Sequence, residues 1–251
     1  DEKAPQGQEE WRATLDRVLE EEDLTLYAQT VVKTTDRHQT YHREIFSRVI
    51  QEDGHVISAG VFMPLAQRLG VVAALDRVVI KQAMKVTREQ AGADHLAVNV
   101  SAVSLKDESF LEWLYGQLQN VPETMPKLVF EFVEYSAVQN MDTMREFSAR
   151  VREAGHGIAL DHFGSSFSNF GYLQSMRPDY VKIDRAFTNE LGKEDSDSDF
   201  FISSLCSVAH SLDVEVIAEG VENTEQFELL KELDVDGVQG YYIDKPGPLD
   251  A

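Results

Sequence analysis

The sequence predicts a single (β/α)8 barrel of the TIM type. The chain has 251 residues, which is the usual size of one such barrel. Short β-branched or aromatic runs alternate along it with longer stretches of helical period. There are eight of these short runs, and they predict strands near 24–32, 41–49, 95–101, 127–134, 157–163, 180–184, 215–221 and 237–242.

The N-terminal part predicts a lead-in segment, 1–22, that precedes the barrel. Residues 9–22 (EEWRATLDRVLEEE) have helical periodicity, with Trp11, Leu15 and Val18 on one face. We expect this helix to pack against the barrel rather than to form a binding surface. The first two strands are separated only by KTTDRHQT, which is too short for a crossover helix, so they should be antiparallel neighbours.

The other six strands are separated by stretches long enough for a helix each, for example 74–90, 140–153 and 224–233. Residues 192–199 (GKEDSDSD) predict a charged loop. Cys206 is the only cysteine, which excludes an internal disulfide and fits a reducing compartment. No repeat or linker interrupts the pattern, so we predict one domain over 1–251, with the barrel at 24–246.

The charge balance excludes general binding to nucleic acid. The chain carries 44 acidic and 23 basic residues, a net charge of −21, and phosphates would be repelled over most of its surface. A small anion could still bind where Lys, Arg or a metal ion reverses the local sign. No apolar run is long enough to span a membrane, and the polar start DEKAPQGQEE lacks an initiator Met, so we interpret the chain as an excised domain.

Polar side chains recur where the predicted strands end, and in a (β/α)8 barrel those ends converge on one mouth. They are Glu44 and Arg48, Asn99, Glu131 and Glu134, Asp161, Lys182 and Asp184, Glu219, and Gln239. Glu44, Asn99, Glu131 and Asp161 offer hard oxygen ligands for Mg²⁺ or Mn²⁺, with Lys182 as a cation beside them. Such a site suits phosphodiester hydrolysis. Any one of these residues alone is more often a solvated side chain; the pattern over seven successive strands carries the argument.

The order and spacing of several longer motifs resemble the EAL domain family, which binds or cleaves cyclic di-GMP. The matching segments are REIFSR (43–48), FMPLAQRLG (62–70), AVNVSAVSL (97–105), FEFVE (130–134), IALDHFGSSFSNFGYL (158–173), DYVKIDRAF (179–187), VIAEGVEN (216–223) and VQGYYIDKP (238–246). The resemblance covers nearly the whole chain, from Leu24 to Pro246.

The resemblance implies roles for individual residues. Glu44, Asn99, Glu131 and Asp161 match metal ligands. Lys182 and Glu219 match residues beside the attacking water, and Gln239 matches a residue that supports the site. Glu134 matches a Glu that holds the loop after the fifth strand. Arg48 matches a phosphate-binding Arg, and Gln29 and Phe46 match residues that line the nucleotide pocket. The predicted ligand-binding set is Gln29, Phe46, Arg48, Asn99, Asp161, Lys182, Glu219 and Gln239.

The chain departs from the active pattern at several of these positions. Active members carry two successive acids after the fifth strand, whereas this chain has Asp161 and then His162. Imidazole is a poor Mg²⁺ ligand, although it can bind Mn²⁺ or Zn²⁺. Phe46 replaces a Leu, and Ser166 replaces a Gly in the loop that follows Asp161. With AGVFMPLAQRLG and NFGYLQSMRPDYVKID, the combination is similar to the degenerate, LapD-type receptors of bacterial biofilm signalling.

We therefore predict a chain that is not an enzyme, with a degenerate site (Glu44, Asn99, Glu131, Asp161, His162, Lys182, Glu219) that requires no metal. It would be the cytoplasmic cyclic di-GMP receptor domain of an inner-membrane protein, a homodimer that relays the signal to other domains of that receptor and binds no nucleic acid polymer. The first alternative is an active cyclic di-GMP phosphodiesterase that uses Mg²⁺ or Mn²⁺. The second is a nucleotide-independent interaction platform, which the intact Gln29, Arg48 and Asp161 disfavour.

Overall fold

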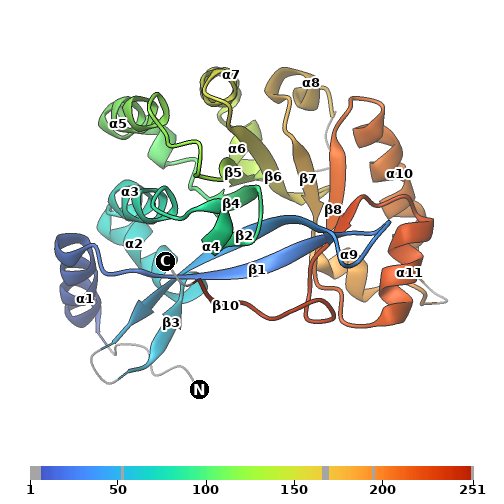
Figure 1. The fold of residues 1–251 in the computed structure, drawn as a ribbon, viewed down its shortest axis with the longest axis horizontal. Coiled ribbons are helices and arrows are strands. Elements are labelled where there is room, and N and C mark those ends of the chain that lie inside the picture. The colour runs from blue at the N-terminus through green and yellow to red at the C-terminus, as the bar shows by residue number, and fades with distance from the viewer. Residues whose placement is uncertain (1–6, 52–53, 166–169, 194–195, 250–251) are drawn as a thin grey trace.

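The strands form one sheet of ten, and eight of them close into a barrel (Figure 1). The structure is a computed structural model that describes residues 7–51, 54–165, 170–193 and 196–249. The strands are β1 Thr25–Lys33, β2 Thr40–Ile50, β3 Val56–Ser58, β4 His95–Asn99, β5 Lys127–Val133, β6 Gly157–Phe163, β7 Tyr180–Ile183, β8 Glu215–Ala218, β9 Gly237–Val238 and β10 Gly247–Pro248.

The barrel order is β1-β9-β8-β7-β6-β5-β4-β2, and β2 pairs back to β1 to close it. β1 is antiparallel to both of its barrel neighbours, β2 and β9, whereas the other barrel pairs are parallel. The predicted barrel, with its first two strands antiparallel, is therefore confirmed. All parallel strands end at the same side of the barrel, the mouth. The opposite end of the barrel is the floor.

The helices lie around the outside of the barrel (Figure 1). They are α1 Gln8–Glu21, α2 Ala59–Leu69, α3 Val72–Ala83, α4 Arg88–Ala91, η1 Ser104–Lys106, α5 Glu108–Leu118, α6 Glu134–Val138, α7 Met141–Glu153, α8 Tyr172–Met176, α9 Arg185–Asn189, α10 Ser198–His210 and α11 Thr224–Glu232. The large core lies between these helices and the outward faces of the strands.

Alternation along the strands sorts the side chains into two cores. In β5, Leu128, Phe130 and Phe132 join the outer core, whereas Val129 and Glu131 alternate with them and so point into the barrel. The interior holds a small apolar layer formed by Val31, Val129, Ala159, Tyr180 and Ile217. Nearer the mouth, the inward positions two residues further along β5 and β7 are Glu131 and Lys182, so the barrel interior becomes polar there.

The elements depart from the sequence expectations in a few places. The single helix expected at 74–90 is divided into α3 and α4, because Thr87 caps the second helix in a reciprocal arrangement with Gln90. The ladders of β8 and β9 end earlier than expected, so Glu219 and Gln239 lie just beyond them. β3 and β10 are short strands without a sequence signal, and they extend the sheet outside the closed barrel.

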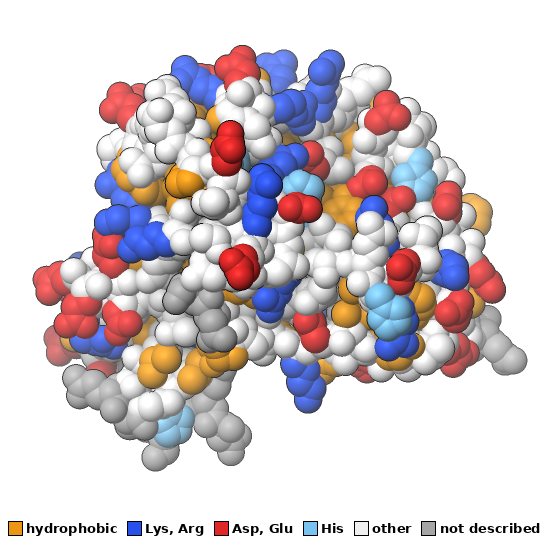
Figure 2. All heavy atoms as spheres, in the orientation of Figure 1, with side chains coloured by type: hydrophobic (Ala, Val, Ile, Leu, Met, Phe, Trp, Pro, Cys, Tyr) orange, Lys and Arg blue, Asp and Glu red, His pale blue; other side chains and the backbone are white. Residues whose placement is uncertain are grey.

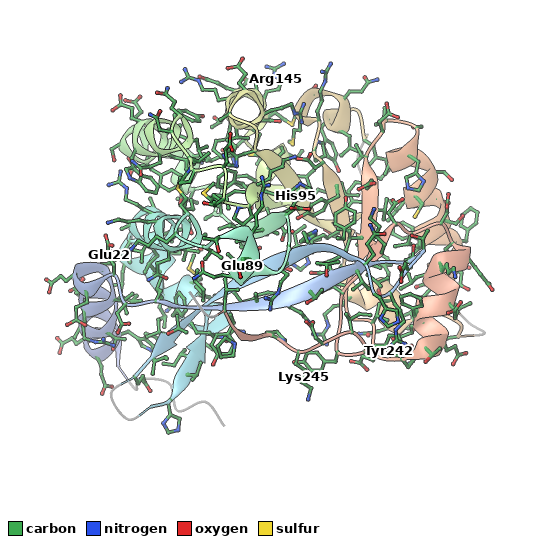
Figure 3. The ribbon with its side chains drawn as sticks, in the orientation of Figure 1. Glu22, Glu89, His95, Arg145, Tyr242 and Lys245 are labelled. Atoms are coloured by element: carbon green, nitrogen blue, oxygen red, sulfur yellow. The ribbon has the colours of Figure 1, made fainter. Side chains whose placement is uncertain are left out.

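The lead-in helix α1 packs against α2 and α3. Trp11, Leu15 and Val18 of α1 are buried. Glu22, labelled in Figure 3, lies just beyond the helix. It accepts hydrogen bonds from the Lys81 Nζ (2.5 Å) and, through its carbonyl, from the Gln82 Nε2 (2.6 Å), which joins α1 to α3. Acidic and basic side chains are interspersed on the face in Figure 2. Among the described helices, none combines the length and the apolar character that a membrane crossing requires.

Candidate active site

A buried ammonium group lies among three carboxylates at the mouth of the barrel. The Lys182 Nζ is 2.7 Å from Glu44 Oε2, 3.1 Å from Glu131 Oε2 and 2.8 Å from Glu219 Oε1. The Lys182 side chain is 0% exposed. Strands β2, β5 and β7 and the end of β8 each contribute one of these residues, so the barrel brings together groups far apart in sequence; Glu44 and Lys182 alone are separated by 138 positions.

Amide side chains hold one carboxylate of this cluster in place. The Asn99 Nδ2 donates to Glu44 Oε1 at 2.7 Å, and the Gln239 Nε2 donates to Glu44 Oε2 at 2.9 Å. Asn99 ends β4, beside β2, and Gln239 follows β9. Glu44, Asn99, Glu131, Lys182, Glu219 and Gln239 therefore do converge, as the sequence predicts, and the Lys182 ammonium lies at their centre.

The pKa shifts in this cluster arise from burial and from the mutual effects of its carboxylates and Lys182. Burial lowers the pKa of Lys182, but Glu131, Glu219 and Glu44 outweigh it and hold that pKa well above its ordinary value. Burial would raise the pKa of Glu44, yet Lys182 and the amide donors bring it below its usual range. Burial and the Glu44 charge raise the pKa of Glu131 well above normal. Burial raises the pKa of Glu219 to about 7, with Lys182 opposing and Asp161 adding to the shift.

Asp161 and His162 lie at the edge of the same cluster. The Asp161 side chain is 14% exposed, and its Oδ1 accepts the His162 backbone N–H at 2.7 Å. The His162 Nδ1 forms a hydrogen bond with Asp184 Oδ2, and the His162 Nε2 lies 3.8 Å from Asp161 Oδ2. Burial lowers the pKa of His162, but the carboxylates of Asp161 and Asp184 raise it above its ordinary value overall. His162 thus bridges two acids, and its backbone φ of 55° is left-handed.

Two cavities open at the mouth on either side of Phe46 and Glu219, which line both. The large mouth cavity has a volume of about 510 Å³ and includes Glu44, Phe62, Asn99, Asp161 and His162 in its lining. The small mouth cavity has a volume of about 270 Å³ and includes Gln29, Arg185, Gln239 and Tyr241. The carboxylate–ammonium cluster therefore lies between two recesses, one of them mainly apolar.

The remaining predicted residues lie around this mouth. The Gln29 Nε2 donates to the Asp244 carbonyl at 2.9 Å. The Arg48 guanidinium lies over the rings of Tyr27 (5.4 Å) and Phe46 (5.8 Å), and Arg48 is outside the described lining of both cavities.

Glu134 is 0% exposed at the start of α6 and accepts a hydrogen bond from the Tyr172 hydroxyl. It therefore connects the end of β5 to α8, which follows the loop after β6. The predicted effect of Ser166 lies outside the described residues.

Asp76 lines the large mouth cavity, and it could not be recognised from the sequence because it stands within a helical stretch. It is 4% exposed, and its Oδ2 accepts from the Ser101 N–H (3.0 Å) and the Ser104 Oγ–H (2.6 Å). Burial raises its pKa to about 7, against the opposing effect of these two hydrogen bonds.

We expect Asp76→Asn to become increasingly stable relative to the wild type as the pH rises from about 4 to 7. Between these pH values the Asp76 carboxyl group holds its proton in the folded wild type but has lost it in the unfolded wild type. The wild type is therefore stabilised by this proton at low pH and loses that stabilisation as the pH approaches 7, whereas the variant has no such group. At roughly 1.4 kcal/mol per pKa unit, the difference should grow by up to about 4 kcal/mol. Urea unfolding of both proteins across this pH range measures it, and two parallel stability curves would contradict it.

The donor set fits a divalent cation by charge and by chemistry. Four carboxylates (Glu44, Glu131, Asp161 and Glu219) surround one ammonium, and carboxylate and amide oxygens are the ligands that Mg²⁺ and Mn²⁺ prefer. In the described part of the chain, no group of three acidic, His or Cys side chains forms a ready-made metal site, and the Lys182 ammonium lies within 3.1 Å of Glu44, Glu131 and Glu219. A bound ion would therefore share these carboxylates with Lys182.

Comparison with known protein families shows that the EAL domain model matches residues 12–246 of the chain, which include all the residues of this site. The chain belongs to the EAL domain family. It is 30% identical over 242 residues to the cyclic di-GMP phosphodiesterase PdeB of Shewanella oneidensis, covering 95% of this chain and 28% of that protein. It is 31% identical to the cyclic di-GMP phosphodiesterase PdeF of Escherichia coli K12, covering 94% of this chain and 31% of PdeF. The chain thus spans about a third of these relatives.

Solved EAL structures superpose closely on this domain. The S helix–GGDEF–EAL part of LapD from Vibrio cholerae has a TM-score of 0.85 at 28% identity, over 97% of this chain and 59% of that one. The EAL domain of FimX from Pseudomonas aeruginosa, solved with cyclic di-GMP, has a TM-score of 0.83 at 25% identity, over 94% and 96%. The predicted family is confirmed, and the similar proteins include both named phosphodiesterases and EAL domains solved with cyclic di-GMP.

The expectation that this EAL domain is not an enzyme is wrong by these comparisons. Several curated relatives at about 30% identity are named cyclic di-GMP phosphodiesterases. That expectation depended mainly on His162, which is a single position in a two-metal site. The structure shows that Glu44, Asn99, Glu131, Lys182 and Glu219 still form one connected cluster despite that change.

Proposed function

We propose that this EAL domain binds cyclic di-GMP at the barrel mouth and hydrolyses one of its phosphodiester bonds with divalent cations. The observation that carries the proposal is the carboxylate cluster around Lys182, which faces two cavities with a surplus of negative charge. A small dianion can approach such a site only if metal ions reverse its sign. The named phosphodiesterase relatives support the same reaction.

Glu44, Asn99, Glu131 and Asp161 would hold the ions. A divalent cation bound there would lower the pKa of a bound water and stabilise charge on the phosphoryl oxygens. Lys182 adds a fixed positive charge beneath the same carboxylates, and Asn99 and Gln239 fix the orientation of Glu44. Glu219 lines both cavities, and its pKa of about 7 lets its carboxyl group accept a proton near neutral pH.

The two cavities match a ligand with two bases joined through a phosphodiester ring. Phe46 stands between them and offers an aromatic face for stacking on guanine. The accessible apolar side chains of the large mouth cavity, such as Met63 and Val133, suit the flat face of one base. The second base would occupy the small mouth cavity beside Tyr241.

Incubation of the purified chain with cyclic di-GMP and either Mg²⁺ or Mn²⁺ tests the proposal. We expect a linear dinucleotide with one terminal phosphate, and no product when the ions are chelated. Glu44→Gln keeps the size of the side chain but removes a ligand charge, so it should form no product. Absence of turnover by the wild type with both metals would refute hydrolysis.

A receptor role is the second candidate. The His162 ring, held by Asp161 and Asp184, favours it because imidazole is a poor ligand for Mg²⁺. The LapD and FimX neighbours, both solved with cyclic di-GMP, support it. In this role the chain would be part of a longer, membrane-attached homodimer, and nucleotide occupancy would be relayed to its other domains. Calorimetry with the metals chelated separates the two roles, because a receptor should bind cyclic di-GMP without ions.

We expect Arg48→Ala to weaken cyclic di-GMP binding about ten- to a hundredfold. A charge-assisted hydrogen bond to phosphate in a cleft contributes roughly 1.5–3 kcal/mol. The Arg48 guanidinium lies over Phe46, which lines both cavities, so its positive charge is close to where a phosphate of the ligand would lie. Arg37→Ala is the matched control, because Arg37 also lies over an aromatic ring, that of Tyr242, but it lies in the turn between β1 and β2 and lines neither mouth cavity. Calorimetry should show an unchanged affinity for the control; equal affinities in both variants would exclude a phosphate role for Arg48.

A further inference from the structure

Two aromatic residues lie in the barrel interior, one layer below the carboxylate cluster. His42 precedes Glu44 by two positions on β2, and Tyr180 precedes Lys182 by two positions on β7, so each points inward with its neighbour. His42 is 0% exposed and Tyr180 2%. Their rings stack with centroids 4.8 Å apart and an interplanar angle of 15°.

This pair is hydrogen-bonded to the cluster through Glu131. The Tyr180 hydroxyl donates to Glu131 Oε1 at 2.7 Å, and the His42 Nε2 lies 3.3 Å from the same hydroxyl. The other oxygen, Glu131 Oε2, faces the Lys182 ammonium. The Tyr180 hydroxyl has one proton, which it donates to Glu131, so at the His42 contact the Tyr180 oxygen can only accept the N–H of His42. This requires the His42 tautomer with its proton on Nε2.

We infer that Tyr180 and His42 are positioning residues that fix the Glu131 carboxylate from beneath, so that it presents a constant geometry to a metal ion at the mouth. This inference rests on the proposed function. Lys182 restrains one oxygen of Glu131 and Tyr180 the other, and both restraints come from β7. His42 in turn limits rotation of the Tyr180 hydroxyl. Outer partners that orient metal ligands in this way usually change metal affinity or activity about 10- to 100-fold when they are removed.

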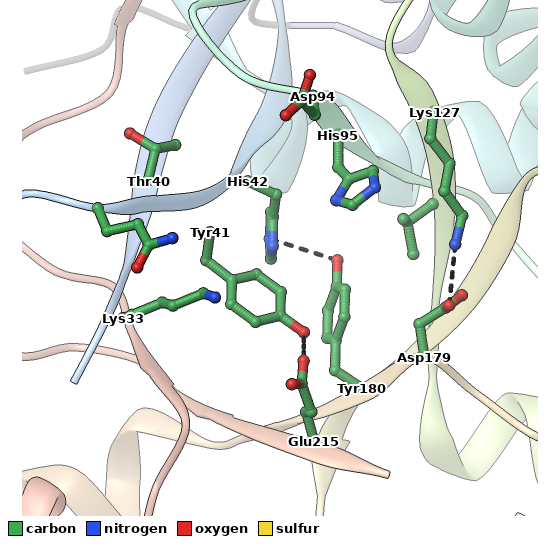
Figure 4. A pocket seen from close by; sticks show the side chains of 12 residues that line it. Lys33, Thr40, Tyr41, His42, Asp94, His95, Lys127, Asp179, Tyr180 and Glu215 are labelled. Carbon is green, nitrogen blue, oxygen red and sulfur yellow. Dashed lines mark hydrogen bonds and ion pairs between the residues drawn. The ribbon is translucent and has the colours of Figure 1, made fainter. Parts of the chain in front are cut away.

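The floor of the barrel offers a matched control. A cavity of about 380 Å³ opens there, and Figure 4 shows Tyr41, His42 and Tyr180 around it. The rings of Tyr41 and Tyr180 form a T-shaped pair, with centroids 5.9 Å apart at 88°, but the Tyr41 hydroxyl donates to Glu215 instead of Glu131. Tyr41→Phe therefore removes the same group from the same aromatic cluster without touching the carboxylates at the mouth.

The first experiment compares Tyr180→Phe with Tyr41→Phe. Mn²⁺ titration by calorimetry should show about tenfold weaker binding for Tyr180→Phe and a change of less than about twofold for Tyr41→Phe. With Mn²⁺ below saturation, kcat should fall in Tyr180→Phe while KM for cyclic di-GMP stays constant. His42→Gln, whose Nε2 can still donate to Tyr180, should keep more of the affinity than His42→Leu. Equal Mn²⁺ affinities for Tyr180→Phe and Tyr41→Phe would overturn the inference.

The second experiment needs neither metal nor turnover. Nitrogen-15 spectra of the histidine rings in the wild type should show His42 protonated on Nε2, and His42→Gln identifies its signal. A proton on Nδ1 would refute the inference even if the chain hydrolyses cyclic di-GMP. Conversely, a wild type with the expected tautomer that neither binds Mn²⁺ nor forms product would refute the proposed function alone.

Discussion

Lys182→Met should destabilise the fold by about 3–5 kcal/mol and abolish hydrolysis. The ammonium is completely buried and has Glu44, Glu131 and Glu219 within 3.1 Å. Its removal would leave these carboxylates without a counter-charge in a water-poor interior, and burial of unpaired charge is costly. The folded state raises the pKa of Lys182 above its ordinary value, so the stabilisation is fully present at neutral pH and is lost only in strongly alkaline solution.

Lys127→Met provides the control for this prediction. Lys127 also pairs with an acid, Asp179, at 2.9 Å, but both side chains are about a third exposed. Solvent screens such a pair, so the change should cost less than about 1 kcal/mol. Urea unfolding at pH 7 measures both variants. Similar losses of stability in the two variants would mean that the Lys182 cluster is not held together by charge. Mn²⁺ should stabilise Lys182→Met more than Lys127→Met, because the ion replaces the lost cation.

Much of the barrel follows from the local sequence, because each strand carries its own alternation. In KLVFEFVE, the apolar side chains on either side of Glu131 predict a strand whose polar residue faces away from the outer core. The crossover helices make the neighbours parallel and bring the strand ends together. Glu44, Asn99 and Glu131 could therefore be assigned to one mouth before any contact was known.

The partners within that mouth could not be predicted in the same way. Lys182 reads in sequence as a cation beside the site, but the structure places its ammonium at the centre of three carboxylates. That depends on how β7 is staggered across the barrel from β2, 138 residues away, and no local pattern contains this offset. The same reason hides the contact of Tyr180 with Glu131. Asp76 was missed because a single acid in an otherwise apolar helix face has no distinctive period.

His162→Asp should raise Mg²⁺-supported hydrolysis by at least about tenfold. Imidazole is a poor ligand for Mg²⁺ and a better one for Mn²⁺, so the wild type should be faster with Mn²⁺. In the wild type, Asp161 and Asp184 raise the pKa of His162, and a protonated ring has no lone pair for an ion, so the Mn²⁺-supported rate should also rise with pH. An aspartate at this position supplies a hard, charged oxygen ligand under both conditions.

The backbone permits this change, because φ at His162 is 55° and Asp and Asn tolerate the left-handed region better than most residues. His162→Asn is the matched control, since it has the same shape as the aspartate without its charge. In His162→Asp three carboxylates would face one another (Asp161, Asp184 and the new one), so Mg²⁺ should also raise its Tm more than that of His162→Asn. If His162→Asp and His162→Asn hydrolyse cyclic di-GMP at the same rate in Mg²⁺, the missing charge at residue 162 does not limit the reaction. A low Mg²⁺-supported rate would then have to be caused by Phe46 or by residues 162–169.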